Sequence, residues 1–115
     1  MREPARDKGR LEHILDAIEH IQNYVEGVTF EQLQSSPLVK HASAYNIQIM
    51  GEAAYWLTNE FKQAHPATPW KMIEKTRHVL VHDYYQINDE VLWSIITDDL
   101  PPLKEQVIRY IEEFN

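Results

Sequence analysis

The sequence predicts an all-α fold: an up-and-down bundle of four to six helices in a single domain spanning residues 1–115. Three observations lead to this prediction. Apolar residues recur at helical spacing along most of the chain, strand-like alternation is absent, and residues that favour helix starts precede the periodic segments. With 115 residues and 43% apolar composition, the chain has the size and the core-forming content of one globular domain.

The first helix is predicted from an apolar stripe at i, i+3, i+4 and i+7 spacing. Its members are Leu11, Ile14, Leu15, Ile18, Ile21 and Val25. Gly27 follows as a natural C-terminal stop. Thr29, with Gln32 three residues later, forms a capping box for a second, short helix that ends near residues 35–37.

A long third helix is predicted over residues 38–64. Its stripe comprises Val39, Ala42, Asn46, Ile49, Met50, Ala53, Trp56 or Leu57, and Phe61. Pro66 ends it, because the residue before a proline is pushed out of helical geometry. Thr68 as N-cap and Pro69 at the first helical position predict a fourth helix that runs to about Tyr85.

The remaining helices follow from one cap and two prolines. Asn88 is the predicted N-cap of the fifth helix, and Asp89 and Glu90 are well placed against its dipole. The Pro101-Pro102 pair breaks or kinks that helix. The segment LKEQVIRYIEEF, residues 103–114, is predicted to finish the chain helically.

Composition excludes several classes of function. The chain has no cysteine, which removes thiolate chemistry and cysteine-ligated zinc and is typical of a cytoplasmic protein. No apolar run reaches the ~18 residues of a membrane helix, and the polar start MREPARDKGR lacks the apolar segment of a secretory signal. The net charge of −7 disfavours nucleic-acid binding by bulk electrostatics, so any RNA contact has to be local or formed by an assembly.

The stretch TRHVLVHDYY, residues 76–85, concentrates the polar chemistry of the chain. Arg77 falls in the middle of the apolar stripe of the predicted fourth helix, between Ile73 and Leu80. A guanidinium there either pairs with an acid such as Glu52 or lines a cleft where it stabilises a phosphate. Spacing alone leaves both interpretations open.

His82 lies five residues after Arg77, so a regular helix points the two side chains ~140° apart. Either the helix distorts near His82, or a second copy of the chain brings its own pair to the same site. A two-fold dimer would also concentrate the few cations of the chain.

His78 and His82 have the i, i+4 spacing of some zinc ligands, but Val79 stands where the HExxH motif has its glutamate. No glutamate in the chain is followed by histidine three residues later, which argues against a di-iron bundle. The sequence therefore predicts no metal and no cofactor.

Several segments together resemble a known family. Arg77-x4-His82-x-Tyr84 is similar to the Arg-x4-His-x-Tyr motif of HEPN-domain proteins, specifically HepT-like toxins paired with minimal nucleotidyltransferase antitoxins. Further similarity is carried, in order, by LEHILDAIEHIQNYVEG, Asn46, Met50-Gly51-Glu52-Ala53-Ala54, Thr68-Pro69-Trp70-Lys71 and Asp98-Asp99-Leu100-Pro101.

The resemblance implies an endoribonuclease that cleaves RNA without metal, as a homodimer with both Arg-His pairs in an interface cleft. It casts His82 as general base or acid and Arg77 as phosphate clamp. His78 is a candidate helper, and Glu52 a candidate to orient Arg77. The expected products are a 2′,3′-cyclic phosphate and a free 5′-hydroxyl.

The resemblance also implies a role for Tyr84 as the residue to which the nucleotidyltransferase partner transfers AMP, which would block the cleft and repel RNA. The alternative interpretation is a helical dimer that does not cut RNA and serves as a binding or nucleotide-binding subunit of a nucleotidyltransferase. Intact Arg77, His82 and Tyr84 favour the enzyme, whereas the net charge of −7 favours the alternative.

Overall fold

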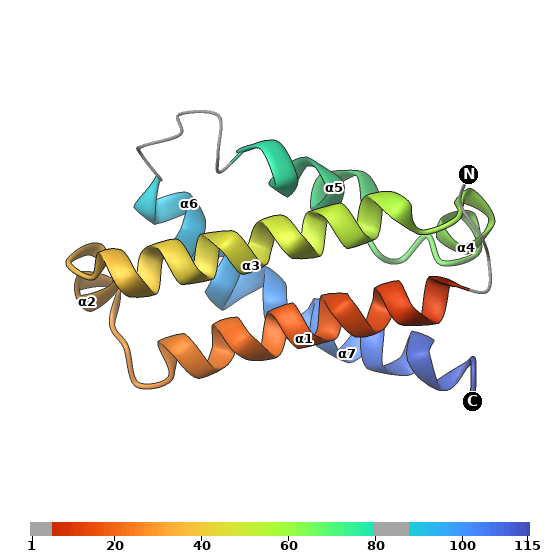
Figure 1. Cartoon of the computed structure of the whole chain (residues 1–115), viewed down its shortest axis with the longest axis horizontal. Coiled ribbons are helices and arrows are strands. Elements are labelled where there is room, and N and C mark those ends of the chain that lie inside the picture. Colours follow the sequence, from red (N-terminus) through yellow and green to blue (C-terminus); the bar gives the residue numbers. More distant parts are fainter. Residues whose placement is uncertain (1–5, 80–87) are drawn as a thin grey trace.

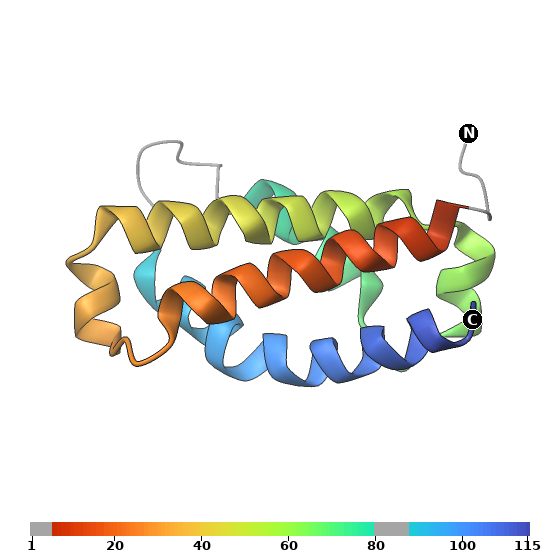
Figure 2. The same cartoon turned by 60° about the horizontal axis from the view of Figure 1, so that its bottom comes forward.

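Four long helices alternate in direction and form the bundle (Figure 1). The computed structural model describes residues 6–79 and 88–115 of the chain. The four helices are α1 (Asp7–Val25), α3 (Pro37–Trp56), α5 (Trp70–Val79) and α7 (Leu100–Glu112). Seen from a second direction, α1 lies between α3 and α7, and α5 lies behind α3 (Figure 2). The predicted all-α, up-and-down bundle is confirmed.

The first two helices form where the sequence predicts them. The stripe of α1 is buried at Leu11, Ile14, Ile18 and Ile21. Gly27, two residues after the helix, has φ 72°, the left-handed conformation that glycine adopts without steric cost. The short α2 (Phe30–Gln34) carries the predicted capping box, in which the Thr29 hydroxyl accepts from the Gln32 N–H and the Gln32 side chain accepts from the Thr29 N–H.

The prediction of a single helix over residues 38–64 is wrong, because α3 ends at Trp56 and a separate helix, α4 (Asn59–Ala64), follows. Leu57 is extended, with φ −60° and ψ 147°, and its side chain is fully buried. Thr58 caps α4 by accepting from the Phe61 N–H, and the buried Asp7 carboxylate accepts from both the Thr58 N–H (2.9 Å) and its hydroxyl (2.7 Å). Hydrogen bonds from a distant segment thus stabilise the break.

The fourth predicted helix begins at Trp70, one residue after the predicted start, and the structure describes it as far as Val79. Thr68, the predicted cap, is buried and its hydroxyl bonds to Gln106 at 2.8 Å and to the Tyr110 hydroxyl at 2.7 Å. These bonds attach the start of α5 to α7. The continuation predicted to about Tyr85 lies outside the described residues.

The last helical stretch combines two α-helices with a π-helical turn between them. Asn88 caps α6 (Asp89–Ser94) as predicted, accepting from the Val91 N–H. A π-helical turn, η2 (Ile95–Asp99), then leads into α7, and the Leu100 N–H bonds to the Ile95 carbonyl. Pro101 has no N–H and its ring crowds the carbonyl four residues earlier, so a wider turn before it keeps the chain helical.

The core is built from the facing stripes of the long helices. Its members on α3 include Ile47, Met50 and Ala54, which pack with the α1 stripe and with Leu100, Leu103 and Val107. Phe61, Trp70 and Tyr110 form an aromatic cluster with ring centroids 5.7–6.0 Å apart, which closes one end of the bundle. Within residues 6–79 and 88–115, no helix combines the length and the apolar character that crossing a membrane demands.

Candidate functional site

The site is positioned by an unusually close approach of α5 to α3 at Gly51. A Cβ atom added to Gly51 would lie 2.6 Å from the Thr76 hydroxyl, 2.8 Å from the Arg77 backbone nitrogen and 3.0 Å from the Ile73 carbonyl oxygen. No larger side chain fits this contact without movement of the backbone. Gly51 therefore brings the backbone of Arg77 directly onto α3.

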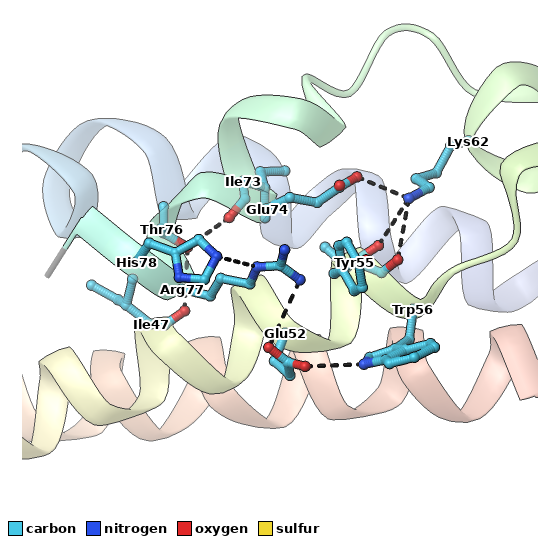
Figure 3. Close-up of polar contacts among 11 residues, drawn as sticks. Ile47, Glu52, Tyr55, Trp56, Lys62, Ile73, Glu74, Thr76, Arg77 and His78 are labelled. Carbon is cyan, nitrogen blue, oxygen red and sulfur yellow. Dashed lines mark hydrogen bonds and ion pairs between the residues drawn. The ribbon is translucent and has the colours of Figure 1, made fainter. Parts of the chain in front are cut away.

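The Arg77 guanidinium lies over an aromatic ring one turn along α3 (Figure 3). Its Cζ is 3.5 Å from the centroid of the Tyr55 ring, and its Nη1 is 4.0 Å from Glu52 Oε2. The ring face attracts the cation and fixes its plane. The Arg77 side chain remains 20% exposed, so it is held in place and still reachable.

His78 accepts a hydrogen bond from Arg77. The Arg77 Nε–H donates to His78 Nε2 over 3.0 Å, and the His78 side chain is exposed. An arginine can only donate, so Nε2 is the acceptor in this contact. The contact orients both groups toward the same surface of the bundle.

Glu52 connects the arginine to a tryptophan. The Trp56 indole Nε1–H donates to Glu52 Oε1 over 3.0 Å, while the other carboxylate oxygen faces Arg77 (Figure 3). Glu52 is 56% exposed, and its 4.0 Å separation from Arg77 is longer than a direct hydrogen bond. An incoming anion can therefore take the guanidinium donors without breaking a buried ion pair.

The end of α3 that carries Tyr55 is anchored by Lys62. Its ammonium donates to Glu74 at 2.9 Å and to the carbonyl oxygens of Ala54 and Tyr55 at 3.4 Å each. These carbonyls belong to the last turn of α3, which ends at Trp56, and the Ala54 carbonyl also accepts from the Leu57 N–H over 3.2 Å. Lys62 therefore connects α4 and α5 to the end of α3 that carries Tyr55, the ring on which Arg77 stacks.

The structure brings together three of the five predicted site residues: Arg77, His78 and Glu52. His82 and Tyr84 lie outside the described residues. Sequence reasoning proposed Glu52 as a partner of Arg77, which the structure shows, but it missed Tyr55. The signal was available, because Tyr55 lies four residues after Gly51 and so shares the helix face that meets α5.

The arrangement suits anion chemistry. A fixed, partly exposed guanidinium can donate paired hydrogen bonds to a phosphate group. The imidazole of His78 lies directly beside it, with Nε2 3.0 Å from the Arg77 Nε. Among residues 6–79 and 88–115, no three His, Asp or Glu side chains gather as a metal site would require.

Comparison with known proteins adds to this geometry. The family model "Ribonuclease HepT-like" matches residues 14–110. "Putative RNase TTE0752" of Caldanaerobacter subterraneus subsp. tengcongensis is 34% identical over 103 residues, which cover 90% of this chain and 92% of that protein. "Probable ribonuclease HepT" of Thermococcus cleftensis is 34% identical over 97 residues, covering 84% and 88%. No solved structure matches the chain.

A third relative, "Putative RNase MJ1380" of Methanocaldococcus jannaschii, is 27% identical over 87% of this chain and 92% of its own length. The family match spans α3 and α5 in full and most of α1 and α7, including the contact at Gly51 and Arg77. The chain belongs to the ribonuclease HepT-like family.

Proposed function

We propose that this protein is a metal-independent endoribonuclease that acts as the toxin of a toxin–antitoxin pair, with Arg77 and His82 as its catalytic residues. The observation that carries the proposal is the state of Arg77. Its guanidinium is stacked on Tyr55, hydrogen-bonded to His78 and partly exposed, in a chain of the ribonuclease HepT-like family. A structural arginine would be expected to form a closer ion pair.

The proposed reaction needs one base, one acid and one phosphate clamp. His82 removes the proton from the ribose 2′-hydroxyl, and the 2′-oxygen attacks the adjacent phosphorus. Arg77 stabilises the charge that builds up on the phosphate oxygens. The bond to the 5′-oxygen breaks and that oxygen takes up a proton from the protonated His82, which now acts as the acid, leaving a 2′,3′-cyclic phosphate and a 5′-hydroxyl. Glu52 and Tyr55 act as positioning residues for Arg77.

The test is cleavage of a labelled RNA by the purified, partner-free protein in EDTA, beside the His82→Ala variant made in the same way. Wild type is expected to cut the RNA and the variant to lose this activity, since a metal-independent mechanism survives the chelator. Absence of cleavage by a folded wild-type protein across several RNAs would instead favour the adaptor function. The net charge of −7 is the observation that supports that alternative.

We propose further that the protein acts as a homodimer, because α3 carries exposed apolar side chains on the face that holds Glu52. Leu38 and Tyr45 are 80% and 64% exposed, and with Glu52 they recur every seven residues, the spacing of a helix–helix seam. Paired α3 helices would bring two Arg77 side chains toward one interface.

Light scattering is expected to give twice the 13.6 kDa mass of one chain. Tyr45→Glu should shift the protein toward monomer and weaken cleavage, because it places a charge in the seam. Ile108→Glu is the matched control: Ile108 is also exposed, at 37%, but it lies on α7, on the other side of α1 from α3 (Figure 2). A wild-type monomer at all concentrations would contradict the shared cleft.

We also propose that a minimal nucleotidyltransferase partner silences the toxin at Tyr84. The tyrosine hydroxyl attacks the α-phosphate of ATP and pyrophosphate leaves, so each AMP adds negative charge beside the phosphate clamp. Labelled AMP is expected to be incorporated into wild type and into Tyr85→Phe, and to be lost in Tyr84→Phe. Equal labelling of both variants would place the modification elsewhere.

A further inference from the structure

We infer that a cationic cleft, separate from Arg77 and located between the start of α1 and the end of α3, binds the phosphodiester backbone of the RNA next to the nucleotide that is cut. The cleft has a volume of about 660 Å³. Arg6, Arg10 and His13 line it from the start of α1, and Glu52 and Trp56 line it from α3. This inference rests on the ribonuclease function proposed above.

The cations of the cleft share one face of α1. Arg10 follows Arg6 by four residues and His13 follows Arg10 by three, the spacing of neighbours on a helix surface. The chain has five arginines and a net charge of −7. Arg6 and Arg10 line the same cleft as Glu52, and Arg77 lies 4.0 Å from Glu52, so three of the five concentrate in one region. A local cationic surface is what an acidic protein needs in order to hold RNA.

One guanidinium nitrogen of Arg10 has no hydrogen-bond partner in the described structure. Its Nη1 is enclosed and has no hydrogen-bond partner among residues 6–79 and 88–115. The nearby carboxylate of Asp7 is already engaged, since both of its oxygens accept from Thr58. A guanidinium nitrogen without an acceptor is unfavourable, and a phosphate oxygen is a strong, charge-matched acceptor for this group. The Arg10 side chain is only partly buried and lines the cleft, so rotation of its guanidinium would turn this nitrogen toward a bound phosphate.

The shape of the cleft suits a nucleotide better than an acidic peptide. The indole of Trp56, 39% exposed, has its Nε1–H bonded to Glu52, which fixes a flat apolar face on which a base can stack. Gly9 also lines the cleft, and a Cβ atom at this position would meet nothing within 4 Å, so the space beside it is open. Arginines around an aromatic face form the usual pattern of single-strand recognition.

Glu52 joins the cleft to the proposed catalytic arginine. One carboxylate oxygen of Glu52 faces Arg77 at 4.0 Å and the other accepts from Trp56. The Glu52 side chain alone therefore separates Arg77 from the cleft. A strand with its scissile phosphate at Arg77 can therefore place a flanking phosphate between Arg6 and Arg10. Arg6 and Arg10 act in binding and positioning, not in the chemical step.

The test is a binding measurement that does not depend on cleavage. A fluorescently labelled, single-stranded 2′-O-methyl oligonucleotide lacks the hydroxyl that attacks the phosphate, so the full-length protein can bind it without cutting it. Arg10→Gln is expected to raise Kd about tenfold, as loss of a charged hydrogen bond does. The slope of log affinity against log salt should fall by about 0.7 for each phosphate contact removed.

Arg109→Gln is the matched control, because it removes the same charge from an exposed position at the end of α7 that does not line the cleft. Circular dichroism shows whether Arg10→Gln folds. If it does not, Arg6→Gln replaces it, since Arg6 is exposed at the edge of the cleft. Trp56→Ala should weaken binding more than Trp56→Phe, which keeps an aromatic face.

Equal Kd values and salt slopes for wild type, Arg6→Gln and Arg10→Gln would overturn the inference and leave the cleft to a partner such as an acidic protein segment. The ribonuclease function would stand in that case, provided wild type still cleaves RNA in EDTA. Absence of oligonucleotide binding by wild type would also overturn the inference. The cleavage assay then shows whether the proposed function fails with it.

Discussion

Replacing Arg77 with alanine is expected to slow RNA cleavage by about 10³-fold, with little change in the amount of folded protein. A cation that stabilises a phosphoryl transition state typically contributes ~10³–10⁵ in rate, and a single oxyanion donor ~10²–10³. The ion pair of Arg77 with Glu52 is long, at 4.0 Å, and Glu52 is 56% exposed, so its loss costs little electrostatic energy. The stacking on Tyr55 is lost as well, and urea denaturation of the variant measures what that packing contributes. Single-turnover cleavage with the enzyme in excess measures the chemical step.

Two further variants separate charge from geometry. Arg77→Lys keeps the charge but loses the planar fork and its stacking on Tyr55, so it should recover only part of the rate. Arg109→Ala removes an exposed arginine from α7 and should cleave like wild type. If Arg77→Ala cleaved at the wild-type rate, Arg77 would be a structural residue and the phosphate clamp would have to be sought elsewhere.

Replacing Gly51 with alanine is expected to lower both stability and cleavage. The added methyl group would lie 2.8 Å from the Arg77 backbone nitrogen, so α5 has to move away from α3. Overpacking of this kind costs ~1–3 kcal/mol, and the better helix propensity of alanine returns about 1 kcal/mol. Two of the three crowded atoms belong to the backbone, so the upper end of this cost applies, and we expect the free energy of unfolding to fall by up to about 2 kcal/mol, measured by urea denaturation.

Gly9→Ala is the matched control for this prediction. Gly9 lies in α1, and a Cβ atom there would meet nothing within 4 Å. The same substitution should therefore raise the free energy of unfolding by up to about 1 kcal/mol, the gain in helix propensity alone. If both variants were stabilised to the same degree, the close contact between α3 and α5 would not constrain the fold in solution.

The sequence predicts those parts of the fold that neighbouring residues determine. The capping box at Thr29, the stop at Gly27 and the cap at Asn88 all appear in the structure, because each depends on residues within one turn. The break at Leu57 and Thr58 was missed because its hydrogen bonds come from Asp7, 51 residues away in sequence. No local window contains both partners.

In the candidate site, too, the sequence predicts the contacts that follow from a single helix and not those that depend on how helices pack. A pairing of Arg77 with an acid could be foreseen, since a guanidinium on an apolar face needs a partner. Its stacking on Tyr55 could not, because that contact depends on how closely α5 approaches α3 at Gly51. The cationic cleft of Arg6 and Arg10 likewise requires α1 to lie beside the end of α3, a tertiary relation that periodicity within α1 does not contain.

The bond between Asp7 and Thr58 has a consequence for how the catalytic surface tolerates change. Asp7 fixes the start of α4, α4 carries Lys62, and Lys62 holds the last carbonyls of α3 beneath the arginine. The position of the Tyr55 ring, on which Arg77 stacks, therefore depends on the first turn of α1. Substitutions in that turn would therefore displace the Arg77 guanidinium from its position over Tyr55 before they unfold the bundle.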